Sequence, residues 1–220
     1  MWWTPERIMW HERAAERCDF HLRLAERIES HLSPAESILE LGCGLGRVSA
    51  LLSLTHPVRA VDIEENAIEC ARERGGKDIY TVSDWRDVKE KADCVLCIFF
   101  GHLERLEEFS SLMALSEKKV ICIYSEHRGQ RDDLIYKKTT AREDMEKSLS
   151  SLGYAVESES FTLSFPQPLL SLEEAEAFIS LSYPKKNVSS YLPFVTESGD
   201  EEYPYTLKNE KRMVLFDIKA

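Results

Sequence analysis

The sequence lacks any run of about 18 consecutive apolar residues, the length that a helix needs to cross a bilayer. Its first residues are charged too early for a secretory signal peptide, so we expect a cytoplasmic protein that does not enter a membrane. Basic residues are also in short supply, because 28 Lys and Arg face 39 Asp and Glu, a formal net charge of -11. Since nucleic-acid binding relies on clustered basic side chains that release counterions, this balance argues against DNA or RNA as a partner.

A cysteine pattern typical of metal or disulfide sites is lacking as well. The chain has six cysteines, and the spacing C-x-x-C occurs at Cys94 and Cys97, within a predicted strand. Side chains three positions apart on a strand point to opposite faces, so we predict buried thiols and no metal centre. The length of 220 residues and the hydrophobic content of 43% suit one α/β domain with a substantial core.

What the chain does have is an apolar strand that runs into a glycine-rich turn and then a helix. Residues 38–47 read Ile-Leu-Glu-Leu-Gly-Cys-Gly-Leu-Gly-Arg, so Gly42, Gly44 and Gly46 alternate with other residues. Glycine at such positions permits a sharp bend and a close approach of the backbone to a nucleotide-like ligand. A dinucleotide-binding fingerprint requires its third glycine where Arg47 stands, which disfavours NAD.

The spacing E-x-G-x-G-x-G, with Glu40 two residues before the first glycine, resembles motif I of the class I S-adenosylmethionine-dependent methyltransferases. The resemblance implies that Glu40 serves the methionine ammonium and that the turn, including Cys43, lines the methionine and ribose portions. An acid suits this cationic cofactor, whereas the pyrophosphate of NAD prefers a helix N-terminus. An ordinary strand-to-helix turn stays open as the alternative.

Two further acids end the next predicted strands. Asp62 follows the turn by about 20 residues, and a carboxylate there can accept hydrogen bonds from both ribose hydroxyls. The resemblance places Ile63 beside the cofactor, and it implies that Asp84 accepts from the adenine amino group with Trp85 next to the ring. Asp62 could instead be a helix N-cap, and Asp84 a residue of a surface loop.

A fourth segment, residues 93–103, is predicted as a buried strand with a following loop and resembles motif IV of the family. The resemblance places Phe99, Phe100 and His102 around the reaction centre, with Phe99 also beside the cofactor. His102 is our candidate catalytic residue, since histidine titrates in the range that suits a general base. It could equally cap the next helix.

The resemblance implies a Rossmann-like three-layer α/β/α sandwich, with a seven-stranded, mostly parallel sheet in the order 3-2-1-4-5-7-6 and one antiparallel strand. We expect a single methyltransferase domain over residues 1–220. Its parts are a helical cover over residues 1–34, a cofactor-binding core over residues 35–160, and a lid-like insertion over residues 161–211 before the last strand. Helical spacing after Thr4 and Pro5 predicts one long helix, broken at most once, over residues 5–31.

Several further residues are candidates for binding the methyl acceptor. Aromatic side chains of the first helix and of the insertion could roof a substrate pocket, or could simply pack their segments. The loop after residue 125 leaves a strand end, the edge at which open α/β sheets bind ligands. The candidates are Trp3, Trp10, Phe100, His127, Arg128 and Tyr183.

Together these patterns predict in-line transfer of a methyl group from S-adenosylmethionine to a small-molecule acceptor, leaving S-adenosylhomocysteine. The acceptor and the oligomeric state are not specified by these residues. Two alternatives stay open. One is a catalytically silent S-adenosylmethionine-binding protein with a regulatory or scaffolding role, and the other, with less support, is an NAD-type Rossmann oxidoreductase.

Overall fold

The structure, a computed structural model, describes residues 2–100, 106–126, 142–183 and 187–219. The chain divides into two compact units. The first comprises His21–Phe161 and Arg212–Ala220, and the second comprises Trp2–Phe20 and Thr162–Lys211. Among the described residues, no helix combines the length and the apolar character that a membrane span requires.

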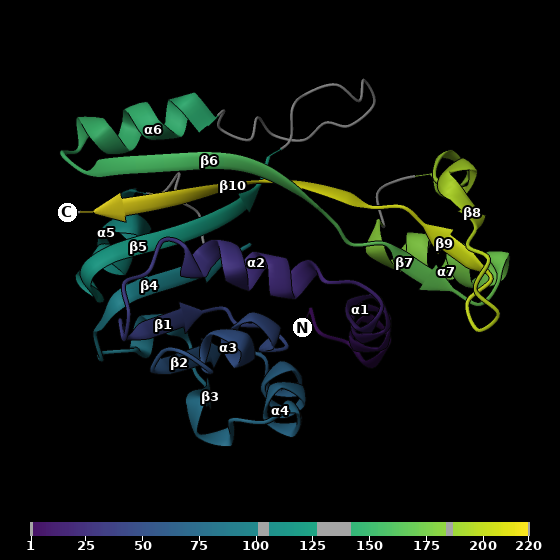
Figure 1. Cartoon of the computed structure of the whole chain (residues 1–220), viewed down its shortest axis with the longest axis horizontal. Coiled ribbons are helices and arrows are strands. Elements are labelled where there is room, and N and C mark those ends of the chain that lie inside the picture. Colours follow the sequence, from purple (N-terminus) through teal and green to yellow (C-terminus); the bar gives the residue numbers. More distant parts are fainter. Residues whose placement is uncertain (1, 101–105, 127–141, 184–186, 220) are drawn as a thin grey trace. The chain divides into compact units, whose positions relative to one another are not determined.

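The first unit is built on a seven-stranded sheet with the order β3-β2-β1-β4-β5-β10-β6 (Figure 1). The pairs formed among strands β1 to β5 are all parallel, and β10 runs antiparallel to β5. The predicted strand order is therefore confirmed, with the last strand of the chain placed between β5 and β6. The strands are β1 (Ile38–Leu41), β2 (Val58–Asp62), β3 (Tyr80–Val82), β4 (Ala92–Ile98), β5 (Ser116–Ser125), β6 (Ala155–Ser164) and β10 (Glu210–Lys219).

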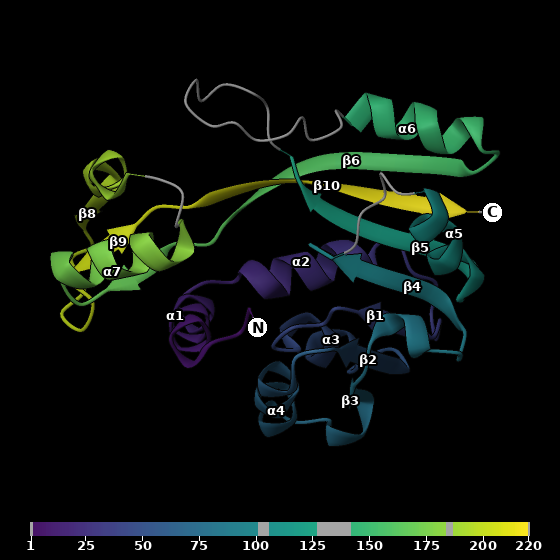
Figure 2. The ribbon, with the colours of Figure 1, turned by 180° about the vertical axis from the view of Figure 1, so that it is seen from behind.

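Helices cover both faces of this sheet, which gives the predicted three layers. In Figure 1, α2 lies in front of the sheet, and in the reverse view of Figure 2, α5 lies in front of it. The helices of this unit are α2 (Phe20–Glu29), α3 (Arg47–Leu52), α4 (Glu65–Arg74), α5 (Leu106–Ala114) and α6 (Arg142–Ser151), with short 3-10 turns η1 (Lys77–Ile79) and η2 (Trp85–Asp87).

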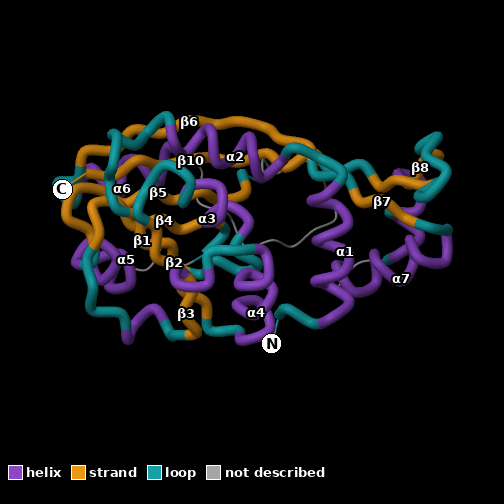
Figure 3. The backbone as a smooth tube through the Cα atoms, turned by 60° about the horizontal axis from the view of Figure 1, so that its bottom comes forward, coloured by secondary structure: helices purple, strands orange, loops and turns teal. Residues whose placement is uncertain are grey.

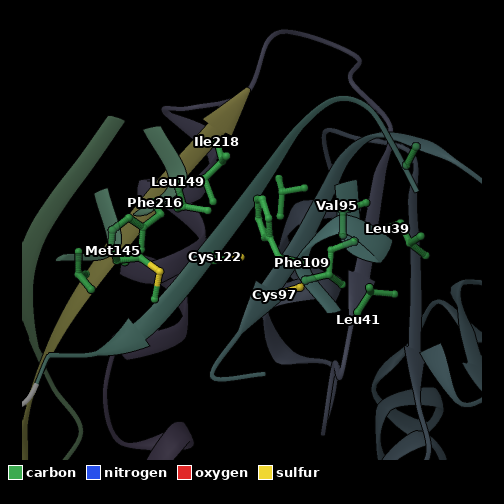
Figure 4. Packing of buried hydrophobic residues seen from close by; sticks show 14 of the residues in the cluster. Leu39, Leu41, Val95, Cys97, Phe109, Cys122, Met145, Leu149, Phe216 and Ile218 are labelled. Carbon is green, nitrogen blue, oxygen red and sulfur yellow. The ribbon is translucent and has the colours of Figure 1, made fainter. Parts of the chain in front are cut away.

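On the α5 and α6 face, the strands contribute every second residue to the core, as the two-residue period of a strand requires. Figure 4 shows Phe109 of α5 beside Cys97 of β4, and Met145 of α6 beside Phe216 of β10. Cys94, by contrast, is buried without belonging to this cluster. All six cysteines are free thiols, so the two that share the C-x-x-C spacing act as small core residues.

The second unit joins the N-terminal helix α1 (Pro5–Glu16) to the segment between β6 and β10. That segment forms a small antiparallel sheet with the order β7-β9-β8, drawn in orange near α7 in Figure 3. The bounds are β7 (Gln167–Leu169), α7 (Leu172–Ser182), β8 (Val195–Glu197) and β9 (Tyr205–Leu207), with 3-10 turns η3 (Val188–Ser190) and η4 (Leu192–Phe194). Its own core contains Leu169, Ala175, Ile179 and Leu207.

The N-terminal helical segment is broken once, between α1 and α2. Thr4 caps α1 by accepting from the Arg7 N–H, with Pro5 in the first helical turn, as the sequence predicts. The expected cover over residues 1–34 is nevertheless divided between the units, because α1 packs with the insertion while all of α2 beyond Phe20 belongs to the first unit. The side chain of Arg13 contacts both carboxylate oxygens of Glu174, at 2.7 and 2.8 Å, which ties α1 to α7.

Candidate active site

The turn after β1 is a left-handed bend built from the three alternating glycines. Gly42, Gly44 and Gly46 have φ angles of 71°, 52° and 68°, a region that other residues rarely adopt. The backbone N–H groups of Gly42 and Cys43 both donate to the Val61 carbonyl, at 2.8 and 3.0 Å. The turn is therefore fastened to the neighbouring strand β2, and α3 begins directly after it.

Close packing inside the protein also requires glycine at two of these positions. A β-carbon on Gly42 would lie 2.2 Å from Cδ2 of Phe100, and one on Gly46 would lie 2.6 Å from Cε1 of Tyr80. The Tyr80 hydroxyl donates to the Gly46 carbonyl at 2.9 Å. The sequence explains these glycines by the approach of a ligand, whereas the structure shows that contacts with the chain itself already demand them.

Glu40 is a buried carboxyl at the base of the turn. Its side chain accepts a hydrogen bond from the Ser49 hydroxyl of α3. Burial raises the pKa of Glu40 to about 7, and the negative charge of Asp62 acts in the same direction, while the Ser49 hydrogen bond opposes the rise. The group is thus poised to exist in either charge state near neutral pH.

Asp62 joins two loops at the carboxyl end of β2. Its Oδ2 accepts from the Gly44 N–H at 2.8 Å, and its Oδ1 accepts from the Glu64 N–H at 2.9 Å. A carboxylate has about four acceptor positions, so each oxygen retains capacity for a further donor. The next side chain, Ile63, is 66% exposed, which is unusual for a large apolar residue next to a buried strand.

Asp84 and Trp85 lie after β3, at the same edge of the sheet. The Asp84 carboxylate accepts from the Arg86 N–H at 3.0 Å and so caps the 3-10 turn η2. The Arg86 guanidinium lies 5.3 Å from the centre of the Trp85 ring, and Trp85 meets the ring of Phe100 edge-on at 6.4 Å. Although β2 and β1 lie between β3 and β4 in the sheet, this ring contact brings the third predicted motif next to the fourth.

Phe99 and Phe100 continue the chain beyond β4. Phe99 has a φ angle of 53° and is 45% exposed, so an apolar side chain is held in a rare backbone conformation at the sheet edge. Such conformations cost about 1–3 kcal/mol and cluster at functional sites. The Phe99 N–H donates to the Ile123 carbonyl at 2.8 Å, and the Tyr124 hydroxyl donates to the Phe100 carbonyl at 3.2 Å.

The remaining candidates fall into two groups. His102, His127 and Arg128 lie outside the described residues, and their roles stay predictions. Three others belong to the second unit, where each has an aromatic neighbour. Trp3 meets His11 edge-on at 5.4 Å, Trp10 meets Phe178 edge-on at 5.4 Å, and Tyr183 stacks on Tyr191 at 4.8 Å. The indole N–H of Trp10 also donates to Glu174 at 3.2 Å.

Two residues that contact the turn were missed by sequence reasoning, namely Ser49 and Tyr80. Ser49 carried a signal, because it is a polar residue between apolar ones on the helix that follows the glycines. Tyr80 carried none, since a tyrosine at the start of a β-rich segment is typical of any strand.

The sequence model of the family described as "Methyltransferase domain" matches residues 38–116, from β1 into the start of β5. Over these residues the chain is similar to a methyltransferase domain. The match spans the glycine turn, Asp62, Asp84 and the end of β4, in the order in which the sequence motifs occur. No curated protein matches this chain in sequence.

Solved structures show the same fold. The plantazolicin methyltransferase BpumL in complex with S-adenosylhomocysteine aligns with a TM-score of 0.58 and 18% identity, over 99% of this chain and 92% of that one. Magnesium protoporphyrin IX methyltransferase from Synechocystis PCC 6803, with bound S-adenosylmethionine, gives a TM-score of 0.52 and 15% identity over 91% of this chain and 78% of that one. A putative methyltransferase from Bacillus halodurans gives 0.55 and 15%, over 90% and 97%.

Proposed function

We propose that this protein is a methyltransferase, which transfers the methyl group of S-adenosylmethionine to a small-molecule acceptor. The observation that carries the proposal is the hydrogen bond between the Asp62 carboxylate and the Gly44 N–H, at 2.8 Å. This hydrogen bond joins the glycine turn to Asp62, the two motifs that would hold the methionine and ribose portions of the cofactor. Both lie at the carboxyl edge of the parallel strands. Ligands of open α/β sheets bind at that edge.

The residues present fit this cofactor in charge and polarity. The buried Glu40 carboxyl suits the cationic methionine portion, and the spare acceptor capacity of Asp62 suits two ribose hydroxyls. Ile63 and Phe99 are exposed apolar side chains on the same edge, which suits the flat faces of an adenine and a reacting centre that excludes water. These acidic groups would repel the negatively charged pyrophosphate of NAD.

The cofactor supplies an electrophilic methyl carbon bonded to a sulfonium. This chain would then hold the acceptor atom close to that carbon in a pocket that excludes water. Such positioning can give the acceptor an effective molarity of about 10⁵ M. We assign Phe99 and Phe100 to the walls of the reacting centre. His102 is proposed as the general base, a role that applies only to an acceptor that must lose a proton.

A small molecule is proposed as acceptor because the formal net charge of -11 disfavours binding to a nucleic-acid backbone. Fold neighbours give weaker support. One is named for magnesium protoporphyrin IX, and another is described in complex with a desmethyl plantazolicin analogue. At 15–16% identity these proteins share the fold, and their substrates are not transferred to this chain.

The test has two stages. Thermal shift with S-adenosylhomocysteine and with NAD should show stabilisation by the first ligand alone. Asp62→Asn should weaken that ligand at least tenfold, whereas Asp87→Asn, at an exposed acid one turn beyond Asp84, should not. Stabilisation by NAD alone would instead support an oxidoreductase.

The second stage measures methyl transfer. Incubation with methyl-labelled S-adenosylmethionine and panels of small amines, alcohols, carboxylates and thiols should label a small product. Binding of the cofactor without transfer to any small acceptor would favour the catalytically silent alternative. Labelling of RNA or DNA instead would overturn the proposed acceptor class while leaving the reaction type in place.

A further inference from the structure

The hydroxyl of Ser49 and the carboxyl of Glu40 form a buried pair that bridges the two ends of the glycine turn. Ser49 is fully buried on α3, and Glu40, on β1, is 3% exposed. Ser49 Oγ donates to Glu40 Oε2. The turn between them is only residues 42–46, so this bond links the strand before the turn to the helix after it.

The surroundings of Glu40 are acidic or neutral. The Asp62 charge acts on it from β2. Burial raises the pKa of the Cys43 thiol and of the Tyr80 hydroxyl, and the Glu40 charge adds a smaller rise. The pKa of the Cys97 thiol is raised first by its interaction with Cys122, then by burial, and least by the Glu40 charge. Within the described residues, the groups that shift the pKa of Glu40 besides burial are the Ser49 hydroxyl and the Asp62 carboxylate. A buried carboxylate in such a setting is costly unless it receives positive charge.

We propose that Ser49 is a positioning residue, which orients the Glu40 carboxyl toward the ammonium group of the cofactor's methionine portion, and that binding of this ammonium expels the Glu40 proton to solvent. The inference rests on the proposed function and extends it from a binding role for Glu40 to a proton-linked one. The ammonium group of the ligand supplies positive charge next to the buried Glu40 carboxylate.

The hydroxyl has a specific part in this linkage. A hydrogen bond donated to a carboxylate favours its charged form. Without it, the proton on Glu40 is harder to remove and the carboxyl is free to rotate. Ser49 therefore lowers the free-energy cost of ionising Glu40 when the ammonium group binds.

The test compares two ligands by titration calorimetry. S-adenosylhomocysteine carries the amino-acid portion, and 5′-methylthioadenosine carries the nucleoside and the sulfur without it. Ser49→Ala should weaken S-adenosylhomocysteine about tenfold, the loss expected for one charge-assisted hydrogen bond, and should change 5′-methylthioadenosine by less than about twofold. Ser53→Ala is the matched control, because Ser53 ends the same helix and its hydroxyl donates locally to the Ala50 carbonyl at 2.8 Å.

The pH dependence separates positioning from mere folding. In the wild type, the affinity for S-adenosylhomocysteine should rise from pH 5.5 toward about 7 and then level off, because the charged form of Glu40 is the binding form. Ser49→Ala should move this plateau to higher pH, and Glu40→Gln should abolish the rise. Titrations at pH 6 in two buffers with different ionisation heats should show release of most of one proton.

Each outcome has a separate meaning. If neither ligand binds, the proposed function fails. If both bind but no proton is released, or if Ser49→Ala weakens both ligands equally, the proposed function survives and the inference is overturned.

Discussion

The ring of Phe100 occupies the space in which a side chain on Gly42 would stand, with its Cδ2 atom 2.2 Å from the position of a β-carbon there. Gly42 follows β1 and Phe100 follows β4, and these strands are neighbours in the sheet. The Tyr124 hydroxyl, which donates to the Phe100 carbonyl at 3.2 Å, holds the second partner in place. The glycine turn is therefore shaped by the loop beside it before any ligand enters.

Gly42→Ala should consequently destabilise the free protein. A left-handed backbone costs alanine about 1 kcal/mol, and forcing a methyl group against a packed ring costs about 1–3 kcal/mol more. We expect a loss of about 2–4 kcal/mol, measured by urea unfolding.

Gly199→Ala is the control for Gly42→Ala, since Gly199 has a similar φ of 76° and no heavy atom within 4 Å of an added β-carbon. Gly199→Ala should lose only the part of the stability that the left-handed backbone costs. Adding Phe100→Ala to Gly42→Ala should recover some of the stability lost through the contact with the ring. Equal losses at the two glycines would show that the ring contact contributes nothing.

Most of the site's acids could be located from sequence because each stands at the end of a strand. The order of Glu40, Asp62 and Asp84 along the chain becomes their order across the sheet edge, since β1, β2 and β3 are parallel neighbours. Local patterns of apolar residues are sufficient for that step. The same holds for the Thr4 cap and for the Ser171 cap of α7, which accepts from the Glu174 N–H at 3.1 Å.

Contacts between distant segments could not be predicted in this way. Arg13 and Glu174 are 161 positions apart, and nothing in either local pattern indicates that α1 belongs with the insertion. The small sheet of the second unit was also missed, because β7, β8 and β9 have only three residues each, too few to establish a two-residue period. Ser49 was missed because its role depends on the Glu40 carboxyl, which contacts the Ser49 hydroxyl only once the chain has folded.

Glu40→Gln should stabilise the free protein at alkaline pH. In the folded chain the pKa of Glu40 is about 7, against 4.5 for an ordinary glutamate, so this group's contribution to stability is present below about pH 4.5 and is lost as pH rises through 7. The amide cannot ionise and still accepts from Ser49. We expect little difference at pH 5 and a gain of roughly 1–3 kcal/mol at pH 8.

The measurement for Glu40→Gln is urea unfolding across this pH range. Glu69→Gln, at an exposed position on α4, should leave the pH profile unchanged. A parallel pH profile for wild type and Glu40→Gln would show that Glu40 is ionised at no unusual cost.

Arg13→Met should loosen the second unit. The Arg13 and Glu174 side chains are 12% and 16% exposed, so removal of the guanidinium leaves a largely buried carboxylate without its cation. We expect a loss of about 1–3 kcal/mol and faster amide hydrogen exchange in α1 and α7. Arg23→Met, in a pair with Glu26 that is 55% and 51% exposed, should change stability by less than about 0.5 kcal/mol. Unchanged exchange in α1 would show that apolar packing alone holds the helix.

A buried ion cluster lies at the amino end of β5, away from the glycine turn. The Lys119 ammonium is 3.6 Å from Asp217 Oδ2 and 3.9 Å from Glu36 Oε2, and it also donates to the His31 carbonyl. Burial raises the pKa of Glu36, but the Ser33 N–H and the nearby lysines outweigh it, so the pKa lies below its ordinary value. This carboxylate therefore adds stability above that ordinary value, and the contribution is lost as the pH falls.

Lys119→Met should remove the buried cation that lies between Asp217 and Glu36, while Lys118 still contacts Glu36 at 3.4 Å. Breaking a buried pair costs about 3–5 kcal/mol. The loss should shrink as the pH is lowered toward 4, because protonation of Glu36 relieves the uncompensated charge. Lys219→Met is the control, since its partner Glu157 is 71% exposed and such surface pairs contribute at most about 1 kcal/mol. Equal effects of the two substitutions at pH 7 would mean that water reaches Lys119, and that the charges there are screened like those at the surface.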